Sequence, residues 1–549
     1  MWTGSPHLAT ASTVAGALLA LLLCGLYLLL LAASAHLLRL GLWALWRPLT
    51  AADGLPAPGD RALGDRAPDD DAAAAADADL PVVTVQLPMR NERFVARRAI
   101  EAACRLDWPR ARLQVQVLDD SDDETVAEVD AAVAERGAAG FDVAAVRRRE
   151  RTSYKAGHLD FALPSARGEL VAVFDADFVP PRDFLRRAYA VLRSDEELAF
   201  VQGRWDFLNE RTSLLTRAQA LILHGLMLVE QAYLSAHGRP VQFNGSGGLW
   251  RKAALLAAGG WVGPSDAASV TEDLDLSYRV HLLGYRGRHL PGLAVPTELP
   301  ETMAAFRAQQ QRWVRGGAQV LADLFHKLRH GRLGLGEKLA MLLHLVRHAR
   351  QPYLALSLLW LPAVGLGLVP LPFSPPGGLL LAVGLVHAAL FVYYAAALRR
   401  LGRSPWRALL GVPLLTALSM GLALALTASL VRGVLGGRAA AEFVRTPKTG
   451  QTGHAGPAGH AGRAGQTAEA RKPSETAAPV AAAAPARPAG YRPVRDRLAR
   501  VEVALGLLYV GLAAVALWQG RYVAAAGLGI LVAGGLLWVG AGSLRIGRA

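Results

Sequence analysis

The stretch VAVFDADFVP, from Val171 to Pro180, places two aspartates directly after a run of apolar residues. The letters LVAVF (Leu170–Phe174) are continuously apolar, which is typical of a strand buried on both faces of a sheet. Because successive side chains of an extended chain alternate, Asp175 and Asp177 should point in the same direction. Aspartate pairs also occur at strand ends that have no function. This stretch alone is therefore compatible with a site for a divalent metal and with an ordinary polar strand end.

The region 81–300 repeats this alternation of strand and helix. Strand-like runs are expected at Val82–Leu87, Leu113–Leu118, Phe141–Val146, Leu170–Phe174 and Ala199–Gln202, with helical stretches between them. This pattern favours an α/β fold, in which helices cover both faces of a parallel sheet. Ligands of such sheets bind beyond the carboxyl ends of the strands, which is where the two aspartates fall.

Long apolar segments flank this charged region. Residues 13–38 are almost uncharged and are long enough to cross about 30 Å of hydrocarbon. Their apolar core is longer than that of a signal peptide and no basic region precedes it, so we expect a retained transmembrane helix. Cys24 and Cys104 are the only cysteines, which argues against a disulfide framework and for a cytosolic soluble domain.

The net charge of +14 is explained without nucleic acid as a partner. Arginines gather at the ends of the apolar segments, for example at Arg47, Arg399 and Arg400, as the positive-inside rule describes. No recognisable nucleic-acid-binding motif accompanies them. We therefore expect a multi-pass protein of the plasma (inner) membrane, with the lipid bilayer as its partner and the α/β domain in the cytosol.

The composition divides the chain into seven segments. They are an N-terminal transmembrane helix and flank (1–50), a linker (51–80), the α/β domain (81–300), interfacial amphipathic helices (301–350), a transmembrane or re-entrant region (351–448), a disordered linker (449–495) and a C-terminal transmembrane hairpin (496–549). Spans after the first one are expected at about 352–373, 378–398, 502–519 and 522–542.

Polar motifs follow the strands in a definite order. They are VLDDSDD with Asp119 and Asp120, SYKAGHL with Lys155, FDADF with Asp175 and Asp177, FNGSGGLWR with Asn244 and Gly245, TEDLDLSYR with Glu272 and Asp273, and QQQRW with Gln309, Arg312 and Trp313. Each has an ordinary structural explanation on its own. The TED segment is a normal helix start with Thr271 as N-cap, and Arg312 and Trp313 could be anchors at a membrane surface.

Taken together, the motifs supply every part of a site for glycosyl transfer. A nucleotide sugar carries a diphosphate, and Mg²⁺ or Mn²⁺ suits carboxylate and phosphate oxygens, so Asp175 and Asp177 are the expected metal ligands. Asp119 would recognise the nucleotide. The metal and Arg312 would stabilise the charge on the departing diphosphate. Asp273 could accept the proton of the acceptor hydroxyl, and Trp313 offers a flat face for a sugar ring.

The order and spelling of these motifs resemble the processive family-2 glycosyltransferases, which include cellulose synthase, hyaluronan synthase, and mannan and glucomannan synthases. The resemblance covers roughly residues 80–450, with DD, DAD, TED and QQQRW in the family's order. It implies a GT-A fold on the cytosolic side, a metal-bound nucleotide sugar, inversion at the anomeric carbon and a β-linked product. The spellings FNGSGGLWR, AAGGW and ELPET look most like the mannan and glucomannan synthases and their bacterial relatives.

The resemblance also implies roles for single residues. Asp120 matches the nucleotide-contacting aspartate, and Asp175 and Asp177 match the diphosphate and metal aspartates. Asp273, with Glu272 beside it, matches the catalytic base. The remaining assignments are Lys155 to the nucleotide sugar, Gln309 and Arg312 to the diphosphate, and Trp313, Asn244 and Gly245 to the acceptor.

The segment EFVRTPKTG (Glu442–Gly450) resembles the gating loop of cellulose synthase through Phe443, Thr446 and Lys448, although an ordinary basic loop beside the membrane is the alternative. If residues 408–436 crossed the membrane, this loop would lie on the side opposite the catalytic site. We therefore expect 408–436 to be an interfacial or re-entrant segment. Five spans then result, with the N-terminus outside.

Three functions are compatible with these features. The favoured one is a polymerase that makes a β-linked polysaccharide from GDP-mannose, UDP-glucose or GDP-glucose, with GDP-mannose or UDP-glucose preferred, and passes the growing chain through its own helices. The second is a transferase that adds one sugar to a lipid acceptor. The third is a catalytically inactive channel or scaffold, and the intact acidic and basic motif residues argue against it.

Overall fold

The computed structural model describes residues 31–50, 79–263, 271–330, 334–346, 350–366, 376–435 and 497–544, together with Gly25, Leu28, Asp53 and Gly54. Most of the linker 51–80 and the whole of 449–495 lie outside these residues. The expected gating-loop positions Phe443, Thr446 and Lys448 lie outside them as well.

A seven-stranded sheet organises the first half of the chain. Its strands are β1 (Val83–Met89), β2 (Leu113–Asp119), β3 (Asp142–Val146), β4 (Leu170–Val173), β5 (Leu198–Phe207), β6 (Gly248–Arg251) and β7 (Arg286–Thr297), in the spatial order β3-β2-β1-β4-β6-β5-β7. The pairs β1/β2, β1/β4 and β2/β3 are parallel. The five strands predicted from the sequence are therefore confirmed, in a GT-A fold.

The expectation of a purely parallel sheet is wrong. Strand β6 runs antiparallel to both β4 and β5, while β5 and β7 are parallel. The sequence signal for these two strands is weak, because β6 has only four residues and β7, RGRHLPGLAVPT, carries charges and two prolines that break the two-residue pattern. The result is a mixed sheet.

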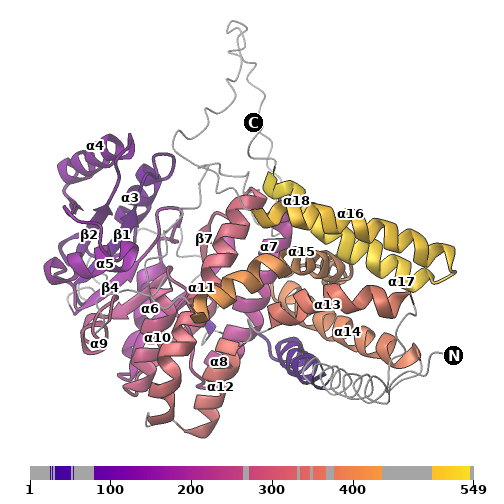
Figure 1. Cartoon of the computed structure of the whole chain (residues 1–549). Helices are drawn as coiled ribbons and strands as arrows, with labels where there is room; N and C mark the ends of the chain where they lie inside the picture. Colours follow the sequence, from indigo (N-terminus) through magenta and orange to yellow (C-terminus); the bar gives the residue numbers. More distant parts are fainter. Residues whose placement is uncertain are drawn as a thin grey trace, which may run out of the picture.

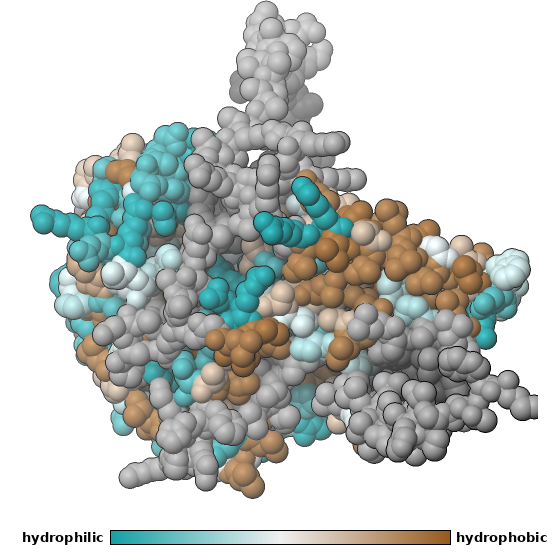
Figure 2. Space-filling model, viewed as in Figure 1, coloured by the Kyte–Doolittle hydropathy of each residue, from teal (hydrophilic) through white to brown (hydrophobic). Residues whose placement is uncertain are grey.

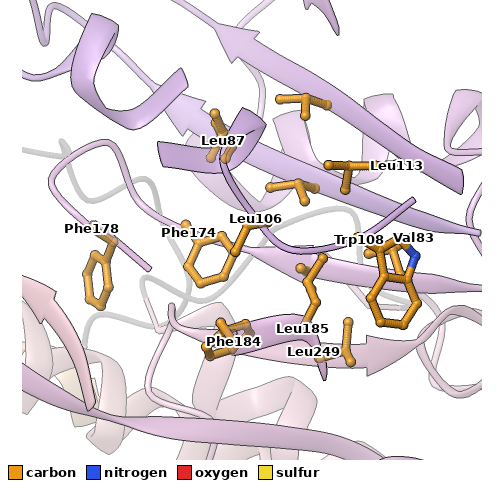
Figure 3. Close-up of a cluster of buried hydrophobic side chains, with 14 of the residues drawn as sticks. Val83, Leu87, Leu106, Trp108, Leu113, Phe174, Phe178, Phe184, Leu185 and Leu249 are labelled. Atoms are coloured by element: carbon orange, nitrogen blue, oxygen red, sulfur yellow. The ribbon is translucent and has the colours of Figure 1, made fainter. Parts of the chain in front are cut away.

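Helices cover both faces of the sheet, as expected. They are α3 (Ala96–Cys104), α4 (Thr125–Ala138) and α6 (Phe184–Arg193) on one face, and α5 (Tyr154–Ala162), α9 (Lys252–Ala257) and α10 (Glu272–Leu282) on the other. In the first core, Phe174 meets Phe184 edge to face with ring centroids 5.0 Å apart (Figure 3). Buried apolar packing on both sides holds the strand ends, and thus the motifs that follow them, in fixed positions.

Further helices lie within the sheet domain and after it. Between β5 and β6 lie α7 (Leu214–Gly225), η5 (Leu226–Gln231) and α8 (Ala232–Ala236). The helices after the sheet are α11 (Met303–His330), α12 (Leu335–Val346), α13 (Arg350–Gly365), α14 (Pro376–Arg400), α15 (Ala408–Leu435), α16 (Arg497–Trp518), α17 (Tyr522–Ala526), η8 (Gly527–Ala533) and α18 (Gly534–Leu544). In Figure 1, α11 lies between the sheet domain and the orange and yellow helices, and it contacts α10, α15 and α18.

Within the described residues, three helical segments are long and apolar enough to cross a membrane, namely Pro405–Leu435, Arg497–Trp518 and Tyr522–Leu544. The apolar helix Leu31–Trp46 is shorter. Figure 2 shows a broad hydrophobic surface over the C-terminal helices, where Leu507, Leu508 and Ile530 are exposed. A surface of this kind is suited to lipid rather than to water.

The described part of the segment 408–436 contains no turn. Over the described part it is one uninterrupted helix, α15, whereas a re-entrant segment has to turn back on itself. A Cβ at Gly411 would meet Leu221 of α7, and one at Gly433 would lie 2.7 Å from the Arg315 carbonyl of α11. Both ends of α15 therefore pack on helices attached to the sheet domain.

Candidate active site

Asp175 and Asp177 leave the tip of β4 in different surroundings. The Asp175 carboxylate forms an ion pair with Lys155 and is partly exposed, and its backbone N–H donates to Ser246 Oγ at 2.8 Å. Asp177 is buried, and its Oδ2 accepts a hydrogen bond from Thr297 Oγ1 at 2.7 Å. The end of β7 therefore holds Asp177, while Asp175 faces the open side of the strand tips.

The two aspartates fit a divalent cation in a nucleotide-sugar complex. Among the described residues, no cluster of three or more His, Cys, Asp or Glu side chains could hold a metal by itself. Magnesium-type sites commonly use one or two carboxylates and complete their coordination with substrate phosphates and water. The oxygen chemistry of Asp175 and Asp177 meets that requirement.

Lys155 is the cation at the centre of the site. It is the second residue of α5 and follows Ser153 and Tyr154, which both have positive φ, and its Nζ donates to the Gly245 carbonyl at 2.9 Å. Burial acts to lower the pKa of Lys155, but the negative charges of Asp175 and Glu272 outweigh it, so the pKa is raised. The ammonium group therefore stays charged among these carboxylates.

Glu272 and Asp273 begin α10, as the TED motif predicted, although the Thr271 side chain makes no capping hydrogen bond. Gly245, at φ +84°, lies so close that a Cβ there would be 3.0 Å from Asp273 Oδ2. Burial, followed by the charge of Glu272, raises the pKa of Asp273 to about 7, against the opposing effect of Lys155. Burial also raises the pKa of Glu272. Asp273 is thus tuned to exchange a proton near neutral pH.

Helix α11 brings the QxxRW motif to this site. Gly316 lies one turn beyond Arg312 on the same face, and a Cβ at Gly316 would collide with Thr271, so the two helices touch at the TED motif. Burial lowers the pKa of Arg312. The negative charges of Glu272, Asp273 and Asp175 act in the opposite direction and reduce this effect. The guanidinium group therefore faces the same carboxylates as Lys155 does.

Trp313 is half-buried against an apolar cluster that includes Phe207, Leu223 and Leu299, with Trp205 packed on the same cluster. Gln309 is half-buried one turn before Trp313. Trp205 belongs to the sequence motif VQGRW, whereas Phe207, the last residue of β5, belongs to none of the motifs. The structure places an aromatic surface beside the Arg312 face of α11.

The FNGS segment is tied into the sheet. Asn244 Nδ2 donates to Gln202 Oε1 at 2.9 Å, and Trp205 Nε1 donates to the Ser246 carbonyl at 3.2 Å. Asn244 therefore shapes the segment through a bond to β5, whereas Gly245 adjoins Asp273 and Lys155. Gln202 belongs to the sequence motif VQGRW, but nothing in the sequence indicated its bond to Asn244.

Asp119 and Asp120 are both bound to arginines. The Asp119 side chain is fully enclosed, with Arg147 Nε 2.9 Å from its Oδ2, so it holds Arg147 in place. Asp120 accepts from Arg148 Nη2 at 2.7 Å and lies 3.2 Å from His158 Nδ1. Burial acts to raise the pKa of Asp120, but His158 and Arg148 outweigh it and lower the pKa to about 2.

The sequence analysis missed the arginine partners of this aspartate pair. The run Arg147–Arg149 follows β3 and offered a signal, since three cations at a strand tip need anionic partners. Which tips meet is decided by the strand order, where β2 and β3 are neighbours. The network fixes the loop that leads to Lys155.

Comparisons with known proteins agree with this arrangement. Residues 84–253 match the model "Glycosyl transferase family 2", and residues 170–428 match "Glycosyl transferase family group 2". Glucomannan 4-beta-mannosyltransferase 2 of Arabidopsis thaliana is 44% identical over 255 residues, covering 46% of each chain. Glucomannan 4-beta-mannosyltransferase 1 of Oryza sativa subsp. japonica is 42% identical over 268 residues, covering 48% of this chain and 50% of that protein.

This chain therefore matches about half the length of these plant relatives. Among solved structures, a mannosyltransferase from Pyrobaculum calidifontis in complex with GDP-Man and Mn²⁺ is 23% identical, with a TM-score of 0.49 over 75% of this chain and 99% of that one. The family matches run together from residue 84 to residue 428 and include every motif of the site. The region from residue 84 to residue 428 is therefore a family-2 glycosyltransferase domain.

Proposed function

We propose that this protein transfers hexosyl units from a nucleotide diphosphate sugar, with inversion, to the end of a β-linked polysaccharide. One observation carries the proposal: Asp273, with its raised pKa, lies beside Lys155 and faces Arg312, and Asp175 completes the group. These residues come from four separate segments of the chain. Together they supply a base and two cations at one point.

The roles follow from charge. Asp273 accepts the proton of the acceptor hydroxyl as that oxygen attacks the anomeric carbon. Lys155 and Arg312 stabilise the negative charge that develops on the departing diphosphate. Direct displacement inverts the anomeric carbon and needs no covalent enzyme intermediate. A divalent cation held by Asp175 and Asp177 would add further positive charge next to the diphosphate.

The aromatic surface of Trp313 and Trp205 supports binding of the acceptor end. A pyranose ring presents an apolar face, and a flat aromatic side chain offers matching surface close to the base. An acceptor that stays bound after each transfer would make synthesis processive. The apolar helices beside the site would then embed the enzyme in the membrane and accommodate the growing polymer.

Mannose is the sugar we propose, with β-1,4 linkage. The support is the 41–44% identity to several plant proteins named glucomannan 4-beta-mannosyltransferases, over 46–47% of this chain. The nucleotide is tested by offering GDP-mannose, GDP-glucose and UDP-glucose separately. The catalytic domain would lie on the cytosolic side of the inner membrane, where nucleotide sugars are available.

The test is an assay of the purified full-length chain in nanodiscs with each labelled donor and Mn²⁺ or Mg²⁺. Blanks are the Asp273→Asn variant and a sample with EDTA. A long product from GDP-mannose, digested by a β-1,4-mannanase and absent from both blanks, is the expected result. A single sugar on a lipid would refute polymerisation, and no transfer from any donor would refute the proposed activity.

A further inference from the structure

Helix α11 has two faces that serve different parts of the molecule. Arg312, Trp313 and Gly316 lie on the face toward the TED motif and the aromatic cluster. The opposite face packs on the C-terminal helices: a Cβ at Gly542 of α18 would lie 3.0 Å from Met303 Cβ, and one at Gly433 of α15 would lie 2.8 Å from Ala318 Cβ. Any shift of these helices is therefore transmitted to the QxxRW face.

An ion pair lies in the middle of this opposite face. Arg307 Nη1 of α11 binds Glu502 Oε2 of α16, across 195 positions of sequence. The side chains are only 3% and 0% exposed, respectively. Arg307 precedes Arg312 by five residues, a little more than one helical turn. This pair is a buried polar link between the QxxRW helix and the C-terminal hairpin.

The chemistry of the pair sets the register between the two helices. A buried ion pair contributes less to stability than well-packed apolar side chains of the same volume, but each partner becomes costly when the other is removed. The hydrogen bond from Arg307 Nη1 to Glu502 Oε2 is directional and favours one relative position of the helices, whereas apolar surfaces can slide. The pair thus specifies where α11 lies along α16.

We propose that Arg307 and Glu502 are positioning residues for the transfer reaction, because they fix α11 so that Arg312 and Trp313 face Asp273. The inference rests on the proposed glycosyltransferase function. It gives the C-terminal hairpin a part in the chemistry, although α16 begins about 60 residues after the end of α15. The hairpin is then more than a membrane anchor.

Glu502→Gln tests this with little change in volume. Loss of the charge should misplace Arg312 and lower kcat about tenfold or more, since small displacements of catalytic groups cost large factors in rate. The KM for the donor should change much less, because Asp120, Lys155 and Asp175 remain in place. The double variant Arg307→Glu with Glu502→Arg should recover much of the lost kcat.

Tyr509→Phe is the matched control. It removes the hydrogen bond from Tyr509 of the same helix to the Leu358 carbonyl of α13, and thus weakens the hairpin without touching α11. Its melting temperature should fall while kcat stays near that of the wild type. If Glu502→Gln keeps wild-type kcat, or if both variants lose kcat in proportion to stability, the positioning role of Arg307 and Glu502 is refuted. Transfer by the wild type in the same assay distinguishes these outcomes from failure of the proposed function itself.

Discussion

Lys155 and Asp175 form an ion pair between the N-terminus of α5 and the tip of β4, and the same ammonium group donates to the Gly245 carbonyl. Glu272 and Asp273 of the TED helix also act on this lysine, since their charges help to raise its pKa. One cation therefore holds together the DAD, FNGS and TED segments. Lys155 is the residue from which the arrangement of the site can be tested most simply.

Lys155→Met should lower kcat about a hundredfold or more, because it removes a cation aimed at the departing diphosphate. It also leaves Asp175, Glu272 and Asp273 facing one another, so donor binding should weaken. Steady-state kinetics with varied donor concentration gives both quantities. Lys252→Met is the control, since Lys252 follows β6 beside the amino end of β4, away from the strand tips that carry the motifs, and its Nζ donates to the Ala166 carbonyl. Equal losses in the two variants would contradict the role of Lys155.

Activity should fall as the pH decreases through about 7, because Asp273 has to be ionised to accept a proton and its pKa is raised to about 7. A pH profile of kcat shows this as a loss on the acid side, well above the ordinary carboxyl value of 3.8. A kcat that stays constant between about pH 5 and about pH 8 would contradict the assignment of Asp273 as the base.

The same shift predicts a change in stability. A carboxyl group whose folded pKa is raised stabilises the fold below its unfolded pKa of 3.8, and this contribution is lost as the pH rises through about 7. Asp273→Asn removes the ionisation. Its melting temperature relative to the wild type should therefore increase between pH 5 and pH 8, two values that roughly bracket that pKa. A constant difference would show that Asp273 titrates normally.

Asp120→Asn should destabilise the protein by about 3 kcal/mol, because it leaves the buried Arg148 without its charged partner. Thermal unfolding at neutral pH measures the effect, and a higher KM for the donor should accompany it, since the loop leading to Lys155 loses its support. Asp122→Asn is the comparison, because Asp122 makes its contacts at an exposed position. A loss of stability no larger than that of Asp122→Asn would argue against the network.

Trp313→Ala should weaken acceptor binding and shorten the product, while the KM for the donor stays close to that of the wild type. The reason is that Trp313 lies in the aromatic surface and not among the charged groups. Sizing the product on a gel measures the change. Trp518→Ala serves as control, because Trp518 is 87% exposed at the end of α16. Products of normal length from Trp313→Ala would contradict the acceptor role.

The sequence predicted the strands that end in motifs, because a buried parallel strand is a continuous apolar run and the functional side chains follow it directly. It did not predict β6 and β7, whose short length and prolines hide the two-residue pattern. The site shows the same division. Asp175, Asp273 and Arg312 were identified from motifs, but the bonds of Asp120 to Arg148 and His158 depend on which strand tips meet in space.

The expectation that 408–436 is an interfacial or re-entrant segment stays a prediction for a similar reason. Composition shows that this segment is apolar, but whether it turns back depends on what it packs against, and α15 extends along α7 and α11 without a break. The pair of Arg307 and Glu502 was equally invisible, since 195 positions separate its members.

The central claim is that Asp273 is the base of an inverting transfer assisted by Lys155 and Arg312. The most direct measurement is the rate of transfer from labelled GDP-mannose by the wild type and by Asp273→Asn, together with the anomeric configuration of the product by NMR. The account predicts a β-linked product from the wild type and a loss of at least about a hundredfold in the variant, which still binds the donor. An α-linked product, or a variant that transfers at the wild-type rate, would contradict it.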